Sequence, residues 1–161
     1  MGKGRTIPIY TTPHDAALAF YQAFESKDLD AMMATWADDE DIICVHPGGP
    51  RLVGYDAVRG AWEQLFANEA RLKFRISEIV MTETVGLALQ SAVEEISTAD
   101  GVSRGTAIVS NVFLRTPSGW RLVRITRRRR RRWWPRHRQG RCIRPPRQAP
   151  RWRASPFEGR L

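Results

Sequence analysis

The feature that most constrains the fold of this chain is a change in hydrophobic period near residue 70. Before that point, apolar residues recur with helical spacing in residues 14–27, 29–36 and 55–68. Beyond it, apolar and charged residues alternate in residues 71–76, as they do in a strand with one solvated face. Helices followed by antiparallel strands predict an α+β domain in which the helices cover one face of the sheet.

The second half of the chain has the signals of an antiparallel meander. Residues 85–97, 103–115 and 120–126 are each predicted to form a strand. Asp100-Gly101 separates the first two of these strands and Pro117-Ser118-Gly119 the last two, and both sequences favour tight turns. Successive strands joined by short turns are expected to pair side by side in one sheet.

A short central segment connects the second and third predicted helices. It contains an apolar run from Ile42 to Val45, which ends at His46 and at the turn sequence Pro47-Gly48-Gly49-Pro50. A run rich in Ile and Val that is bounded by Pro and Gly predicts a short buried strand. We therefore expect His46 at the end of this strand, at the mouth of a pocket.

Charge divides the chain into two parts. Residues 1–123 contain 11 lysines and arginines and 16 acids, a net charge of −5, whereas residues 124–161 contain 15 arginines and one acid, a net charge of +14. The first part suits one globular domain, which we predict at residues 10–126. Residues 127–161 have few aliphatic side chains and strong like-charge repulsion, so they are predicted to be a disordered, Arg-rich tail.

Two interpretations of this tail compete. Arginines followed by Trp133-Trp134 are typical of segments that bind nucleic acid or a membrane surface. The tail contains no lysine, however, and Arg, Pro, Trp and Gly are the residues that a GC-rich gene encodes out of frame. We expect no membrane partner, and we keep nucleic-acid association through the tail as the less favoured alternative.

The rest of the composition limits the compartment and the cofactors. Two cysteines, Cys44 and Cys142, cannot form a disulfide framework, and no signal peptide or long apolar run is present, so we expect a cytoplasmic protein. The three histidines lack the spacing of metal ligands. No metal and no other cofactor is expected.

Several separated motifs, taken in order, carry a family resemblance. They are the strand ending in His46-Pro47-Gly48-Gly49, Gly54 before a helix that contains Trp62, the strand sequence Asn111-Val112-Phe113, and Gly119-Trp120-Arg121-Leu122-Val123. Together they resemble the SnoaL-like branch of the nuclear transport factor two-like superfamily, over residues 14–123. The resemblance implies a cone-shaped α+β barrel, in which a strongly curved, mostly antiparallel sheet wraps the N-terminal helices around an apolar cavity.

The resemblance also implies a small-molecule pocket protein. Relatives include ketosteroid isomerases, scytalone dehydratase, epoxide hydrolases and many proteins that only bind a ligand. The leading hypothesis is a cofactor-free isomerase, dehydratase or hydrolase that acts on a hydrophobic carbonyl or hydroxyl compound. The alternative is a ligand-binding module without catalysis, and a homodimer is expected by analogy with the pairing of sheet faces in the superfamily.

Five side chains are candidates for the pocket. His46 is the candidate catalytic acid–base or hydrogen-bond donor, because imidazole titrates near neutral pH, and its alternative is a buried histidine bonded to a backbone carbonyl. Asn111 shares an apolar strand face with Val109 and Phe113, so its amide needs a backbone group or a ligand as its partner. The candidate aromatic lining residues are Tyr21, Trp36 and Trp62, although aromatic residues at such spacings are more often plain core.

Nearby acids are interpreted by the face on which they lie. Asp41 would lie on the opposite face of the strand from His46 if the alternation holds, so we expect a solvated acid. Glu94 and Glu95 must point to opposite faces of their strand. Whichever points inward needs a partner or a raised pKa.

The tail also suggests a hypothesis about the gene. Members of the resembled family commonly follow their Gly-Trp-Arg-Leu-Val strand with His-His-Ala-Ser-Pro, and codons can be chosen for Arg124–Pro135 so that skipping two bases encodes this ending. We hypothesise that one base was lost near the junction of Val123 and Arg124, and that Ile125 and Thr126 occupy the positions of the two histidines. The nucleotide sequence of the locus tests the hypothesis: restoring one base must give this ending, followed shortly by a stop codon.

Overall fold

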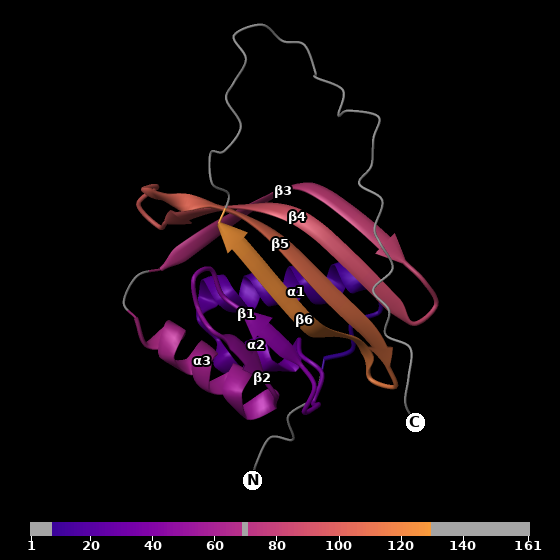
Figure 1. Ribbon diagram of the computed structural model, residues 1–161. Helices are drawn as coiled ribbons and strands as arrows, with labels where there is room; N and C mark the ends of the chain where they lie inside the picture. Colours follow the sequence, from indigo (N-terminus) through magenta and orange to yellow (C-terminus); the bar gives the residue numbers. More distant parts are fainter. Residues whose placement is uncertain (1–7, 69–70, 130–161) are drawn as a thin grey trace, which may run out of the picture. The chain divides into compact units, whose positions relative to one another are not determined.

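The structure is a computed structural model that describes residues 8–68 and 71–129. In this part of the chain, three helices lie against one face of a six-stranded sheet (Figure 1). The helices are α1 (Pro13–Ser26), α2 (Leu29–Ala34) and α3 (Tyr55–Ala67). The strands are β1 (Ile43–Val45), β2 (Arg51–Val53), β3 (Leu72–Glu83), β4 (Leu87–Thr98), β5 (Ser103–Thr116) and β6 (Gly119–Arg129).

The sheet is curved, open and mostly antiparallel. Its strand order is β2-β1-β6-β5-β4-β3, and among the described strands only β1 and β6 run parallel. The long strands bend over α1, so that one face of the sheet is concave and holds the helices (Figure 1). This is the predicted α+β architecture, with N-terminal helices on a curved, mostly antiparallel sheet, but the sheet does not close into a barrel.

Local signals explain where α1 and α2 begin. The hydroxyl of Thr12 accepts a hydrogen bond from the backbone N–H of Asp15 at 3.0 Å, and the Asp15 carboxylate accepts one from the N–H of Thr12 at 3.1 Å. This reciprocal pair is a capping box, and Pro13 occupies the first turn, where its missing N–H is tolerated. Asp28 caps α2 by accepting a hydrogen bond from the N–H of Ala31 at 2.9 Å. None of the helices in the described residues combines the length and apolar character needed to cross a membrane.

Strand β3 is longer than predicted. It starts at Leu72 and continues past residue 76 to Glu83. A β-bulge between Ser77 and Val80 interrupts the pairing with β4. A bulge shifts the phase of the side chains along a strand, so the alternating pattern could not be followed across it from the sequence.

Strand β6 also runs further than predicted, to Arg129 rather than to residue 126. Arg127 pairs with Val109 of β5, and Arg129 pairs with Ala107. The side chain of Arg127 is 3% exposed, so this residue belongs to the interior of the domain and not to a solvated tail. The remainder of the predicted tail, residues 130–161, lies outside the described residues.

The core between the helices and the sheet is aromatic. Trp62 has no exposed surface and packs edge-to-face on Phe20 and Phe24, with ring centroids 5.6 and 5.2 Å away. Phe24 also packs on Phe74 of β3 at 4.4 Å, which ties α1 and α3 to the sheet. Edge-to-face pairs of this kind add about 0.5–1.5 kcal/mol each to the burial of their surface.

The turn between β5 and β6 requires glycine at position 119. Gly119 has a φ of 97°, and a Cβ added to it would lie 2.6 Å from the carbonyl oxygen of Tyr10. That oxygen accepts a hydrogen bond from the N–H of Trp120 at 2.8 Å. The close approach fixes the segment before α1 against the start of β6.

Candidate ligand-binding site

The sequence-predicted pocket residues come from separate parts of the fold. Tyr21 lies on α1, Trp62 on α3 and Asn111 on β5, whereas Trp36 follows α2 and His46 follows β1. The ring of His46 packs edge-to-face on Trp62, with centroids 4.8 Å apart. Four of the five are buried, and His46 is the partly exposed member of the set.

Glu94 is the centre of a buried polar network on the concave face. Strand β4 turns Glu94 inward, where it has no exposed surface, and turns Glu95 outward. The hydroxyl of Tyr21, whose pKa is raised by burial and by this carboxylate, donates a hydrogen bond to Glu94 Oε1 at 2.8 Å. Arg127 Nε donates to both carboxylate oxygens, at 3.0 and 2.8 Å. The partner that an inward acid was expected to need is therefore Arg127.

Strand register brings Arg127 to this position. Cys44 on β1 pairs with Ile125 on β6, and both are buried. Because side chains alternate along a strand, His46 and Arg127, each two residues further on, follow onto the same inner face. The guanidinium of Arg127 lies over the ring of Phe20, 5.2 Å from its centroid, in a geometry that allows a cation–π interaction.

Asn111 and Gln90 form a second buried pair. They are neighbours across β5 and β4 and are 1% and 2% exposed. Asn111 Nδ2 donates a hydrogen bond to Gln90 Oε1 at 2.9 Å. The amide therefore pairs with a side chain, whereas the sequence suggested a backbone group or a ligand.

Some polar atoms of this interior have no hydrogen-bond partner among the described residues. They are Nη1 and Nη2 of Arg127, Oδ1 of Asn111 and Nε1 of Trp62. Buried polar groups in proteins are nearly always paired, and an unpaired one costs about 1–3 kcal/mol. Three of these four atoms are N–H donors, so the group that would satisfy most of them is a hydrogen-bond acceptor.

His46 is a neutral imidazole at physiological pH. Burial lowers its pKa, and the positive charge of Arg127 lowers it further, to about 4. Its Nε2 lies 3.6 Å from Sγ of Cys44, and burial raises the pKa of that thiol to about 12. His46 can therefore donate or accept a hydrogen bond, or accept a proton, but it is not charged near neutral pH.

Trp36 lies beside a second hollow. It forms a bridge with Leu122, near the start of β6, whereas Arg127 lies near the end of that strand. A groove of about 850 Å³ is lined there by Trp36, Tyr10 and Arg121, together with residues of α2 and the β5–β6 turn. The structure thus gives Trp36 a position at this groove, and it gives the other four predicted residues positions around the polar network.

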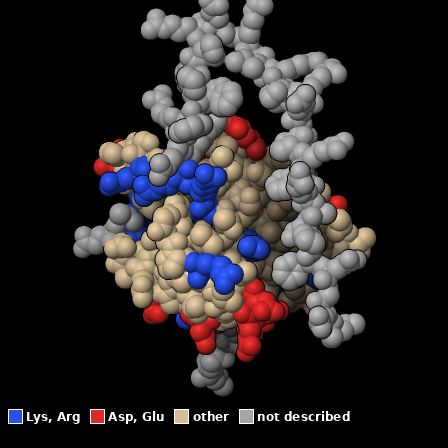
Figure 2. Space-filling model, in the orientation of Figure 1, with Lys and Arg blue, Asp and Glu red and all other residues tan. Residues whose placement is uncertain are grey.

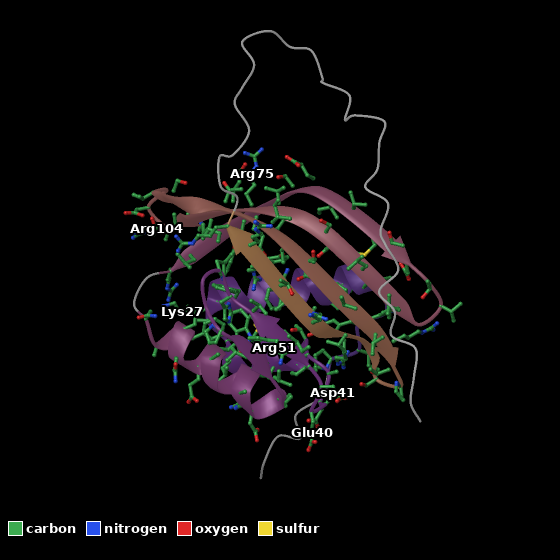
Figure 3. The ribbon with its side chains drawn as sticks, in the orientation of Figure 1. Lys27, Glu40, Asp41, Arg51, Arg75 and Arg104 are labelled. Atoms are coloured by element: carbon green, nitrogen blue, oxygen red, sulfur yellow. The ribbon has the colours of Figure 1, made fainter. Side chains whose placement is uncertain are left out.

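The acids before β1 lie on the surface. Asp41 is exposed, as expected, and its backbone N–H donates to the carboxylate of Asp39 at 2.8 Å. Glu40 and Asp41 point away from the sheet (Figure 3), on a side of the molecule where acidic side chains gather (Figure 2). Within residues 8–68 and 71–129, no three His, Cys, Asp or Glu side chains are grouped so that they could bind a metal ion.

Three members of the network, Glu94, Gln90 and Arg127, are not among the five sequence-predicted site residues, although the sequence did require a partner for Glu94 if it pointed inward. Gln90 lies between Ala88 and Ala92 on the inner face of β4, so a polar residue in a row of small apolar ones was the available signal. Arg127 has the appearance of the first residue of the basic tail. Two features of the sequence indicated its burial: Arg127 lies two residues after Ile125 and so on the same face of the strand, and an inward Glu94 needs a cation as its partner.

The architecture and the buried network together define the class of protein. An open curved sheet with N-terminal helices on its concave face, and polar side chains enclosed between them, is the cystatin-like fold of NTF2-like proteins. The sequence matches the SnoaL-like domain model over residues 14–126, which is more than half of the chain, and the protein belongs to this family.

Solved crystal structures agree with this assignment. A proposed calcium/calmodulin-dependent protein kinase type II association domain from Thiobacillus denitrificans is 31% identical, and the match covers 77% of this chain and 99% of that chain with a TM-score of 0.69. A proposed dehydratase of the NTF2-like family from Streptomyces avermitilis is 27% identical, with coverages of 71% and 90% and a TM-score of 0.64. A protein of unknown function with a cystatin-like fold from Nostoc punctiforme is 16% identical, with coverages of 76% and 96% and a TM-score of 0.63. No curated protein matches the chain.

Proposed function

We propose that this protein binds a small hydrophobic molecule with a carbonyl or hydroxyl group between α1, α3 and the concave face of the sheet. The observation that carries the proposal is the set of unpaired polar atoms of Arg127, Asn111 and Trp62 within an aromatic interior. Small-molecule sites are usually built in this way, with apolar walls and a few polar groups that orient the ligand. His46 is the partly exposed residue beside this interior, so we propose that the ligand enters past it.

The chemistry proposed for this site is that of a cofactor-free isomerase, dehydratase or hydrolase, with His46 as the candidate catalytic residue. Its neutral imidazole could accept a proton from a bound ligand, whereas Glu94 is held in its ion pair with Arg127. The proposed activity of the Streptomyces avermitilis relative supports this class of reaction. Binding without chemistry is the alternative, and a ligand that is bound but never converted would favour it.

We also propose that the protein forms a homodimer through the convex face of the sheet. Strands β4 and β5 expose apolar side chains there, each 39–44% exposed: Leu87, Leu89, Ile108 and Leu114. Light scattering coupled to size exclusion should give twice the mass of one chain, and Ile108→Lys should reduce it to the mass of one. A monomeric wild-type protein would contradict this part of the proposal.

The pocket is tested by ligand binding. Thermal-shift screening of small aromatic ketones and alcohols should yield a ligand, since binding to the folded state raises the melting temperature. His46→Ala and Asn111→Ala should each weaken its binding while the fold is retained, and His46→Ala should lower any turnover. Asp41→Ala is the matched control, because Asp41 is exposed and points away. If both test variants bind the ligand as tightly as wild type, the proposed site is wrong.

A further inference from the structure

The Arg127 guanidinium uses only part of its hydrogen-bonding capacity. A guanidinium has five N–H groups. The single N–H of Nε is used by Glu94, whereas Nη1 and Nη2 have no acceptor among the described residues. The side chain is 3% exposed, so bulk solvent does not supply the acceptors. Four N–H bonds on one buried group are therefore available to a ligand.

The surroundings of these donors carry no net charge. Glu94 and Arg127 neutralise each other at 2.8 Å, and their side chains are 0% and 3% exposed. Burial raises the pKa values of Tyr21 and Cys44 and lowers that of His46, so all three are uncharged near neutral pH. A buried charge that lacks a counter-ion is strongly unfavourable. Among the described residues, Arg127 is the buried cation beside Glu94, and a second anion here would have to share it.

The balance of charge and donors points to one class of ligand. A carboxylate matches the fork of an arginine in shape, but it would leave one negative charge in excess beside Glu94. An uncharged carbonyl oxygen accepts hydrogen bonds from Nη1 and Nη2 and leaves the charge of the site unchanged. A hydrocarbon leaves all four N–H bonds unsatisfied.

We propose that Glu94 selects the ligand by its charge: it neutralises Arg127 but leaves Nη1 and Nη2 free, so that the site takes an uncharged carbonyl compound and rejects the corresponding carboxylate. This inference rests on the proposed function, whose pocket it uses. It assigns two roles that are separable by mutation. Arg127 anchors the oxygen, and Glu94 determines which oxygen-bearing group is accepted.

Three probes of similar size separate these roles: acetophenone, ethylbenzene and benzoate. Dissociation constants are measured by ligand-observed saturation-transfer NMR near neutral pH. Wild type should bind acetophenone at least about tenfold more tightly than ethylbenzene, a difference in binding free energy of about 1.4 kcal/mol. It should bind benzoate more weakly than acetophenone.

Glu94→Gln is the decisive variant, because it keeps the size of the side chain and an oxygen that accepts from Arg127 Nε. It should raise the affinity for benzoate at least about tenfold and make benzoate the preferred probe. Glu95→Gln is the matched control, because Glu95 is the outward neighbour and pairs with Arg75 at 3.7 Å on the surface. This control should leave the order of the three affinities unchanged.

A second variant covers the case in which Glu94→Gln does not fold. The uncharged double variant Glu94→Gln/Arg127→Met should bind acetophenone and ethylbenzene equally. If wild type binds none of the probes, both the pocket and this inference fail. The pocket stands and the charge selection is refuted if wild type binds acetophenone no better than ethylbenzene, or if wild type already prefers benzoate. The same holds if Glu94→Gln still prefers acetophenone to benzoate.

Discussion

Removal of Arg127 from the buried ion pair should be among the most destabilising single changes in this domain. In Arg127→Met, the Glu94 carboxylate keeps the hydrogen bond from Tyr21 but loses its only charged partner among the described residues. Breaking a buried pair in this way costs about 3–5 kcal/mol, because the remaining charge has no counter-ion. Domains are stable by about 5–15 kcal/mol in total, so the loss is a large fraction of the whole.

The exposed pair of Arg75 and Glu95 supplies the matched comparison. Its atoms are 3.7 Å apart and its side chains are 82% and 52% exposed, so Arg75→Met should cost at most about 1 kcal/mol. Urea unfolding followed by tryptophan fluorescence gives the free energies of unfolding. The double variant Glu94→Leu/Arg127→Met should recover most of the loss, since apolar side chains need no counter-ion. If Arg127→Met costs no more than Arg75→Met, or if the double variant is as unstable as the sum of its single changes, the account of this pair is wrong.

Three further predictions concern other parts of the domain. The pKa of His46 is lowered from its ordinary value of 6.5 to about 4, so the unfolded state binds more protons than the folded state between these pH values. The free energy of unfolding should therefore fall as the pH falls through this window. His46→Gln should reduce that fall in urea titrations at several pH values, and an unchanged profile would contradict the burial of the imidazole. Gly119→Ala should lower the melting temperature more than Gly101→Ala, because both have positive φ but only a Cβ at 119 meets backbone within 3 Å; equal losses would show that the close approach is unimportant. Truncation after Arg131 should leave the melting temperature unchanged and abolish any salt-sensitive binding to nucleic acid. Truncation after Thr126 removes the buried Arg127 and should lower the melting temperature. Equal melting temperatures for the two truncated proteins would contradict the extension of β6 beyond residue 126.

The sequence determines the helices and most of the strands through local signals. The structure confirms the three predicted helices, and the capping residues Thr12 and Asp28 lie directly before the first two of them. The two-residue alternation identifies β4 and β5, and it correctly requires one of Glu94 and Glu95 to point inward. The SnoaL-like family and its α+β fold follow from these elements and from the order of the motifs.

The polar network depends on contacts that a local pattern does not contain. Gln90 meets Asn111 only because β4 and β5 pair in one particular register. Arg127 is the first residue of an arginine run, and its burial depends on the pairing of β6 with β5 and β1 and on an acid 33 residues earlier in the chain. The bulge in β3 is likewise a feature of its pairing with β4, which the sequence of β3 alone does not contain.

The frameshift hypothesis acquires a structural consequence. Ile125, which occupies the position of one predicted histidine, is fully buried and pairs with Asn111 across β6 and β5. A restored reading frame would place a histidine there and would replace Arg127, so Glu94 would need a different partner. Sequencing the locus distinguishes the two chains, and the binding and stability predictions above apply to the chain that contains Arg127.

The central claim, that the interior between the helices and the sheet accepts a small uncharged molecule, is tested most directly by a crystal structure with ring-brominated acetophenone. The anomalous signal of bromine locates the ligand without reference to its shape. The account predicts a bromine site beside Trp62, with the ketone oxygen within hydrogen-bonding distance of Nη1 or Nη2 of Arg127. Bromine found only in the groove beside Trp36 and Arg121, or only on the convex face of the sheet, would contradict it.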